Sequence, residues 1–374
     1  MVLVVESPFS ARDAERFGVT DLRAAGLAVE VWEIADLTLP DARRQWFEPS
    51  PDVAIERVGT WDRFEELAGR LTSDDAVVLI CGVYAPLSAK YSALLKRILD
   101  SQALVGTLAS GTIPPPVGTQ RLRAWAYASL KKLQALARPP VEVPRALDFV
   151  WAGTTVKAVA SELRDARTTC RFIHTLDADL LLAVEPRAIR EQFALIVDTM
   201  GPFHPDYVSQ GMENPWPPDC YQSIVQSVSE GLTARGLEVV VAAHPRAKPG
   251  SLDALYPGLQ VVHGRTPELL ASCAFAIAIE GSTSLGMAAY LQTPVLFVNA
   301  PCVPAFVAGI AASFRRAMHA PNAAVGELSS VAMPPLVDQA ALARYVRRYV
   351  KSAGSPDRRF WSVVAADILD SPRD

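Results

Sequence analysis

The chain has 374 residues, of which 50% are hydrophobic and 20% charged, a composition that provides cores for two ordinary domains and excludes a mainly disordered chain. Its 36 basic and 40 acidic residues give a formal net charge of −4, so no global positive field exists to attract nucleic acid. The N-terminus lacks a leader pattern, and the apolar stretch 300–314 is too short and too proline-interrupted to span a membrane. We therefore expect a cytoplasmic protein.

The cysteines are five in number and show no CxxC spacing. An odd, scattered set does not indicate a disulfide framework, and buried small hydrophobic residues explain it better than a metal site or a nucleophile. The sequence thus predicts a reducing cytoplasm as the compartment and reduced, buried thiols at every position: Cys81, Cys170, Cys220, Cys273 and Cys302.

The first half of the chain alternates between strand and helix patterns. An apolar strand over 3–6, a polar loop, a helix over 12–25 and a strand over 29–34 predict a βαβ unit with a parallel sheet. The same alternation continues with a helix over 60–71, a strand over 76–81, a helix over 87–101 and a strand over 103–108. This pattern is typical of a doubly wound α/β domain.

A basic amphipathic segment follows at residues 121–138. It contains five Lys or Arg and no acidic residue, and it includes Trp125 and Tyr127. The solvated face of an ordinary core helix is the favoured interpretation. Contact with a membrane surface or a lipid-linked acceptor is the alternative.

A second α/β series begins near residue 190, after a helix predicted over 186–192. Its predicted strands are 193–197, 237–243, 259–262, 274–279 and 295–298, and its predicted helices are 219–236, 266–272 and 283–292. The expected fold class is therefore α/β, with two Rossmann-like domains. Ligands of open parallel sheets bind at the carboxyl ends of the strands, so we expect the ligand-binding residues in the loops after these strands.

The loop after 193–197 carries Asp198 and His204, either of which could act as the general base that activates an acceptor hydroxyl. The competing interpretation is a rigid turn in which Asp198 caps backbone amides. The next loop carries His244, Pro245, Arg246 and Lys248, a cationic group suited to a leaving phosphate, or otherwise a solvated surface loop.

The third loop runs from Glu280 to Ser284. Gly281 would let the backbone approach a ligand, and the hydroxyls of Ser282, Thr283 and Ser284 precede a helix, which favours an anion site. An ordinary helix cap would explain one of these hydroxyls but not all three.

Other motifs give little support for other chemistry. Asp177 and Asp179 have DxD spacing, but so short a pattern arises by chance, and we expect no metal and no cofactor. The chain has no GxGxxG after its first strand, no Walker A loop, no HExxH and no GxSxG, which disfavours nicotinamide enzymes, P-loop kinases, zincins and common hydrolases. His174, His263 and His319 are expected to be structural or surface residues.

The second half resembles the nucleotide-sugar half of GT-B glycosyltransferases. The resemblance rests on His244-Pro245, residues 266–270, residues 280–284 and residues 289–296, and it is strongest to bacterial sialyltransferases and related CMP-sugar enzymes with HP and S-S/T motifs. Residues 12–18, 29–32 and 198–206 are similar to blocks of capsule and O-antigen biosynthesis proteins.

The resemblance implies a role for each of these positions. His244, together with Ser282, Thr283 and Ser284, would bind the donor phosphate; Glu280 and Gly281 would contact the nucleoside. Asp198 would match an acidic general base, although Asp-Thr-Met-Gly departs from that motif and His204 competes with it. The loop carrying Glu6, Ser7, Ser10 and Arg12 would face the acceptor.

These implications define an expected enzyme. It has an acceptor-side domain over 1–190, a donor-binding domain over 191–355 and a C-terminal helix over 356–374 that crosses back. It transfers a sugar, with CMP as one candidate carrier, to a hydroxyl of a surface glycan or lipid-linked glycan without a metal. A nucleotide-sugar 2-epimerase-like enzyme and a non-catalytic scaffold of a glycan-synthesis complex are the alternatives.

Overall fold

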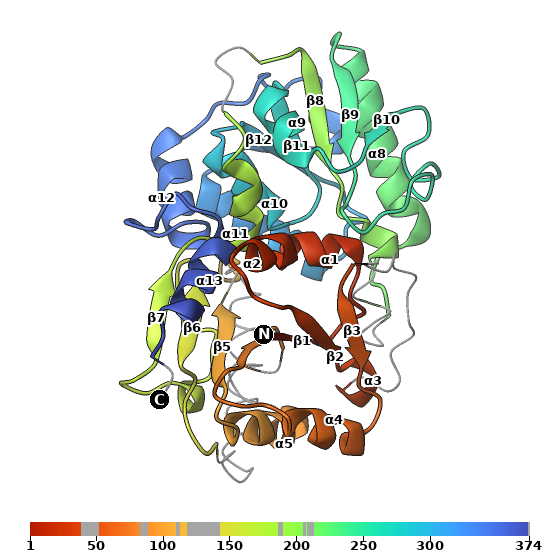
Figure 1. Cartoon of the computed structure of the whole chain (residues 1–374). Helices are drawn as coiled ribbons and strands as arrows, with labels where there is room; N and C mark the ends of the chain where they lie inside the picture. Colours follow the sequence, from red (N-terminus) through yellow and green to blue (C-terminus); the bar gives the residue numbers. More distant parts are fainter. Residues whose placement is uncertain are drawn as a thin grey trace.

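A computed structural model describes residues 1–38, 52–81, 83, 89–109, 113–117, 143–185, 190–204, 207 and 213–372. These residues form two α/β bodies, one above the other in Figure 1, and each is built on its own sheet.

The N-terminal sheet has seven strands in the order β3-β2-β1-β4-β5-β6-β7, and every pairing is parallel. The central strands are apolar runs buried on both faces, as a parallel sheet covered by helices requires. The strands are β1 (Val2–Val5), β2 (Glu30–Glu33), β3 (Ala54–Arg57), β4 (Ala76–Leu79), β5 (Leu104–Ala109), β6 (Phe149–Ala152) and β7 (Thr169–Phe172).

The C-terminal sheet repeats this winding with six parallel strands in the order β10-β9-β8-β11-β12-β13. Its strands are β8 (Phe193–Val197), β9 (Glu238–Ala242), β10 (Gln260–Val262), β11 (Phe275–Ala278), β12 (Val295–Asn299) and β13 (Asn322–Ala324). Both orders reverse beside the first strand of their sheet, which is the Rossmann arrangement. The expected fold class, two Rossmann-like α/β domains, is confirmed.

Two helices, α1 (Ala11–Arg16) and α2 (Val19–Ala24), lie along the side of the N-terminal body that faces the C-terminal one (Figure 1). The prediction of one helix over 12–25 is wrong, because Gly18 interrupts it with a φ of 58°. The Trp361 side chain fills the space that a Cβ at Gly18 would need. Glycine is therefore required at this break for both its conformation and its lack of a side chain.

The other helices cover the two sheets. Those of the N-terminal body are α3 (Ala35–Thr38), α4 (Trp61–Ala68) and α5 (Ala89–Leu99), and those of the C-terminal body are α8 (Pro218–Thr233), α9 (Thr266–Ser272), α10 (Ser284–Tyr290), α11 (Ala305–Met318) and α12 (Gln339–Tyr349). Short 3₁₀ turns include η2 (Leu176–Leu181), between the sheets, and η3 (Gly201–Phe203), after β8. Of the helix predicted over 186–192, residues 190–192 are not helical and residues 186–189 lie outside the described part.

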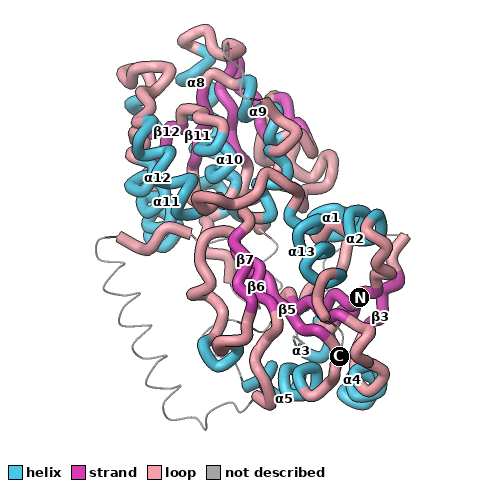
Figure 2. The backbone as a smooth tube through the Cα atoms, turned by 60° about the vertical axis from the view of Figure 1, so that its left-hand side comes forward, coloured by secondary structure: helices cyan, strands magenta, loops and turns pink. Residues whose placement is uncertain are grey.

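The last helix, α13 (Phe360–Leu369), belongs to the N-terminal core. Phe360, Trp361 and Val364 are buried in one cluster with β1 and β6, and Figure 2 shows α13 beside α1 and α2. Trp151 Nε1 donates to Asp367 Oδ2 at 2.9 Å, which fixes this helix against the sheet. The chain therefore returns to its first domain after completing the second.

The cysteine prediction is wrong for three of the five residues. Cys220 and Cys302 form a disulfide with a Cα–Cα distance of 5.9 Å, and Cys170 is exposed, whereas Cys81 and Cys273 are buried thiols as expected. The disulfide removes the argument that cysteine usage indicates a reducing compartment. Among the described residues no helix is long and apolar enough to cross a membrane, and the basic segment 121–138 lies outside them.

Candidate functional site

The candidate site lies where the carboxyl ends of three neighbouring strands, β9, β8 and β11, approach the N-terminal body. The loops after these strands contain His244, His204 and Ser282, and helix α1 contributes Arg12 and Arg16 from the opposite body. The gap between β8 and β11 is the switch point of the C-terminal sheet, where open α/β sheets bind ligands. Topology thus brings the three predicted loops together.

His244 is held in one orientation by its own backbone and its neighbour. Its N–H donates to Asp198 Oδ2 at 2.9 Å, and the Arg246 N–H donates to its Nδ1 at 3.2 Å. A neutral ring that accepts at Nδ1 carries its proton on Nε2, so the other nitrogen is a hydrogen-bond donor. Burial, followed by the positive charges of His204 and Arg12, lowers the pKa of His244 to about 3. The ring is therefore neutral near pH 7.

Asp198 serves as an anchor for the loops around it. Its Oδ1 accepts from the Met200 N–H at 2.8 Å and the Tyr256 hydroxyl at 2.6 Å, and its Oδ2 accepts from His244. The side chain is only 3% exposed, and burial raises its pKa. This geometry matches the rigid-turn interpretation, because both oxygens already accept hydrogen bonds from protein donors.

His204 is the better-placed candidate for the base. Its ring lies 5.3 Å from that of His244 between centroids and is partly exposed. Asn214 fixes the preceding turn, because its Nδ2 donates to the carbonyl oxygens of Gly201 at 3.1 Å and Pro202 at 2.6 Å. No sequence pattern indicates a role for Asn214.

Glu280 and Gly281, expected at the nucleoside, are used in packing. Glu280 accepts a hydrogen bond from Trp216 Nε1, which ties the loop after β11 to the segment before α8, and burial raises the pKa of its carboxyl. A Cβ at Gly281 would lie 2.5 Å from Phe314 and 2.7 Å from Ile310. The glycine therefore admits helix α11 rather than a ligand.

The three hydroxyl residues after β11 differ in whether they already form hydrogen bonds within the protein. Ser282 Oγ accepts from the Ser284 N–H and lies 3.3 Å from the Ser284 hydroxyl, so these two close a local turn at the start of α10. Thr283 is exposed and faces a cavity between the two bodies. Of the three, Thr283 is best placed to meet a ligand.

The acceptor-side residues of the N-terminal loop are partly structural. Ser10 caps α1 and exchanges hydrogen bonds with Asp13, and Glu6 accepts from the Tyr91 hydroxyl. Ser7 is exposed. Arg12 contributes to the field at His244, and burial lowers the pKa of its guanidinium.

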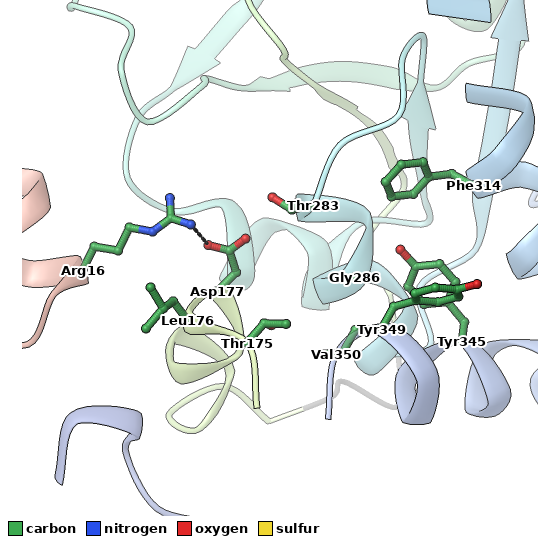
Figure 3. Close-up of a pocket in the computed structure, with 10 residues that line it drawn as sticks. All are labelled: Arg16, Thr175, Leu176, Asp177, Thr283, Gly286, Phe314, Tyr345, Tyr349 and Val350. Atoms are coloured by element: carbon green, nitrogen blue, oxygen red, sulfur yellow. Dashed lines mark ion pairs between the residues drawn. The ribbon is translucent and has the colours of Figure 1, made fainter. Parts of the chain in front are cut away.

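Arg16, which the sequence did not single out, joins the same surface. It pairs with Asp177 at 3.2 Å (Figure 3). Its positive charge also contributes to lowering the pKa of His244. We call Arg12, Arg16, His204, His244 and Arg246 the interdomain basic cluster. Lys248, two residues beyond Arg246, is exposed at its edge.

A cavity of about 150 Å³ adjoins this cluster between the bodies (Figure 3). Arg16 and Asp177 form one wall, Thr283 lies at its edge, and Phe314, Tyr345 and Tyr349 form the opposite wall. Within the described ranges no three His, Cys, Asp or Glu side chains are grouped as a metal site. Asp177 and Asp179 have separate partners, Arg16 and His174.

Comparison with known proteins gives similarity of overall shape only. No family model and no curated protein matches the chain. Solved structures that align with it include the calicheamicin glycosyltransferase CalG4 (12% identity, 99% of each chain, TM-score 0.48) and the glycosyltransferase SnogD from Streptomyces nogalater (15%, 98% of each, 0.44). Os79 from O. sativa in complex with UDP aligns over 99% of this chain and 94% of its own, at 10% identity and a TM-score of 0.40. At these values the likeness does not place the chain in a family.

Proposed function

We propose that this protein is a GT-B-type glycosyltransferase that transfers a sugar from a nucleotide-sugar to a hydroxyl acceptor. The observation that supports it most is His244, a neutral imidazole whose Nδ1 is occupied and whose Nε2–H remains a donor inside a basic cluster. A fixed donor close to three arginines suits the phosphate that leaves when a glycosidic bond is exchanged.

The phosphate-binding groups come from two loops of the C-terminal body, those after β9 and β11. In the proposal, His244 Nε2–H and Arg246 contact the donor phosphate, Thr283 and Ser282 add hydroxyl donors, and Lys248 adds charge at the rim. Charge-assisted hydrogen bonds of this kind stabilise the negative charge that develops on the leaving phosphate. Because these residues provide the positive charge, we propose a metal-independent and cofactor-independent reaction.

The proton is transferred to His204. It takes the proton of the acceptor hydroxyl while the acceptor oxygen forms a bond to the anomeric carbon of the sugar. The bond between that carbon and the phosphate oxygen breaks, and its electron pair leaves with the nucleotide. Asp198 acts indirectly in this scheme, since it holds the backbone of His244 and Met200.

The finer assignment concerns donor and acceptor. We propose a surface-glycan or lipid-linked glycan hydroxyl as acceptor, at the cytoplasmic face of the membrane, as the motif resemblance implies. The base of the nucleotide is left to the experiment below, with CMP and UDP carriers as its first candidates.

A thermal-shift panel tests the proposal. Wild type, His244→Ala and the control His319→Ala are each measured with CMP, CDP, UDP, GDP and dTDP. His319 is exposed and bonded to Asp338, so its variant controls for loss of a histidine. Stabilisation by at least one nucleotide is expected in wild type and the control, about 2.7 kcal/mol at 100 times Kd, and its loss in His244→Ala. No shift with any nucleotide would overturn the proposal.

A further inference from the structure

The interdomain cavity shares residues with the proposed phosphate site. Arg16 belongs to the basic cluster and lines the cavity, and Thr283 belongs to the hydroxyl loop and lines it as well. A group bound in the cavity would therefore be directly adjacent to a phosphate bound at the cluster. This adjacency is the first constraint on its occupant.

The walls of the cavity differ in chemistry. One wall presents the guanidinium of Arg16, the carboxylate of Asp177 and the hydroxyl of Thr283, whereas the other presents the rings of Phe314, Tyr345 and Tyr349 (Figure 3). The Tyr345 and Tyr349 rings lie 5.0 Å apart between centroids. A compact ring with polar edges and an apolar face would satisfy both walls.

We propose that this cavity binds the sugar that is transferred, as a single neutral pyranose ring. The inference rests on the proposed function, and it adds the substrate class and the residues that select it. Tyr349 and Tyr345 pack against the C–H face of the ring. Asp177 accepts hydrogen bonds from the sugar hydroxyls, and Arg16 and Thr283 donate hydrogen bonds to them.

The size of the cavity limits the occupant. A volume of about 150 Å³ is enough for one sugar ring. The nucleobase is a less suitable occupant, because a ribose separates it from the phosphate whereas the transferred sugar is bonded to the phosphate directly.

Charge limits the occupant further. Arg16 and Asp177 neutralise each other at 3.2 Å, and their side chains are 35% and 21% exposed. A sugar that carries a carboxylate would have to break this pair or leave its own charge beside Asp177, and either event costs free energy in a partly buried site. The cavity therefore selects neutral sugars over acidic ones.

Binding measurements on the full-length protein test this inference. Dissociation constants are measured by calorimetry for three pairs: UDP and UDP-glucose, GDP and GDP-mannose, CMP and CMP-N-acetylneuraminate. The variants are Tyr349→Ala, its milder form Tyr349→Phe, Asp177→Asn and the control Tyr290→Ala. Tyr290 is partly buried against the same core as Tyr349 but does not line the cavity.

The expected result is a selective loss. For a neutral nucleotide-sugar, Tyr349→Ala should weaken binding about tenfold, Asp177→Asn and Tyr349→Phe should weaken it measurably, and binding of the free nucleotide should stay within about twofold. Tyr290→Ala should change neither.

Three outcomes would overturn the inference while the proposed function stands. The first is equal weakening of nucleotide and nucleotide-sugar, which would place the nucleoside in the cavity. The second is no effect on either ligand, and the third is Tyr349-dependent binding of CMP-N-acetylneuraminate. Absence of any nucleotide binding by wild type would instead overturn the proposed function, and this inference with it.

Discussion

Two histidines, the buried His174 and the partly buried His244, show how differently the same side chain is used at the hinge and at the candidate site. His174 is fully buried, and its Nδ1 lies 2.9 Å from the Thr175 carbonyl oxygen. Its Nε2 lies 3.0 Å from the Arg358 carbonyl oxygen and 3.2 Å from Asp179 Oδ1. Both ring nitrogens therefore lie within hydrogen-bond distance of groups on neighbouring segments.

The hydrogen bonds of the two rings distinguish a structural histidine from a candidate binding residue. Every polar atom of the His174 ring is used to join the end of β7, η2 and the segment before α13. Within the described residues the His244 ring is bonded through Nδ1, and in the proposed function its Nε2–H binds the donor phosphate. A histidine whose bonds end inside the protein holds the fold together, whereas one with a fixed but unused donor indicates a binding site.

The largest effect is expected at His204. In His204→Gln we expect activity to fall about 10²–10⁴-fold, because the variant cannot take the acceptor proton. Nucleotide binding should be retained, since His244 and Arg246 are unchanged. Rates of nucleotide release with an acceptor present, compared with the thermal-shift panel, check this. Activity within a few-fold of wild type would assign the base elsewhere.

The next effect concerns the stability that His174 provides. His174→Ala removes a fully buried ring whose two nitrogens join three segments, and it leaves Asp179 with the Phe360 N–H at 2.7 Å. Deleting a fully buried side chain together with its hydrogen bonds costs about 3–5 kcal/mol. Urea denaturation should show this loss for His174→Ala and little change for the exposed His319→Ala. Similar midpoints for both variants would contradict the structural role.

A smaller loss of stability is expected when the hydroxyl that holds Asp198 is removed. Tyr256→Phe removes the 2.6 Å hydrogen bond to Asp198 and the 2.9 Å contact with the Tyr221 hydroxyl. We expect the free energy of unfolding to fall by about 1.5–3 kcal/mol, the value for a buried hydrogen bond to a charged group. Denaturant titration checks the value, with Tyr290→Phe as control.

The smallest effect is a pH dependence that His244 produces. Its pKa is about 3 in the folded chain and about 6.5 when unfolded, so below pH 6.5 only the unfolded chain takes up this proton. Stability should therefore fall with decreasing pH by at most about 1.4 kcal/mol per pH unit, and this contribution is absent above pH 7.

The variant His244→Asn isolates that contribution, because the raised pKa values of Asp198 and Glu280 act in the opposite direction in both proteins. Unfolding free energies at pH 7, 6 and 5 should show wild type losing up to about 2 kcal/mol relative to the variant. Parallel pH profiles would mean that the ring takes up a proton in the folded state as readily as in the unfolded one.

The fold was largely accessible from the sequence because parallel strands buried on both faces read as continuous apolar runs. Residues 76–79 and 193–197 are such runs and became β4 and β8. Strand β7, by contrast, is exposed at the sheet edge and carries Arg171 and Cys170, so no apolar pattern predicts it. The break at Gly18 depends on Trp361, 343 residues further along the chain, which no local pattern contains.

The site was accessible only in part. The loops after β8, β9 and β11 follow from strand positions, and His244 and Arg246 do lie in them. The basic cluster, however, also needs Arg16, and its cavity needs Asp177 and Tyr349, which only tertiary packing brings together. Conversely, the local sequence predicts ligand contacts for Gly281 and Glu280. It does not show that Phe314 packs against Gly281 or that Trp216 donates a hydrogen bond to Glu280.

The two connections between the bodies limit how they can move. In the described part of the chain, one connection runs through residues 173–178 and the other through residues 350–359, and they lie side by side: the Thr175 N–H donates to the Val350 carbonyl oxygen at 2.8 Å. Two adjacent connections favour rotation of one body against the other about a line through that contact. A distance between labels on α1 and on the loop after β9 would report such a rotation.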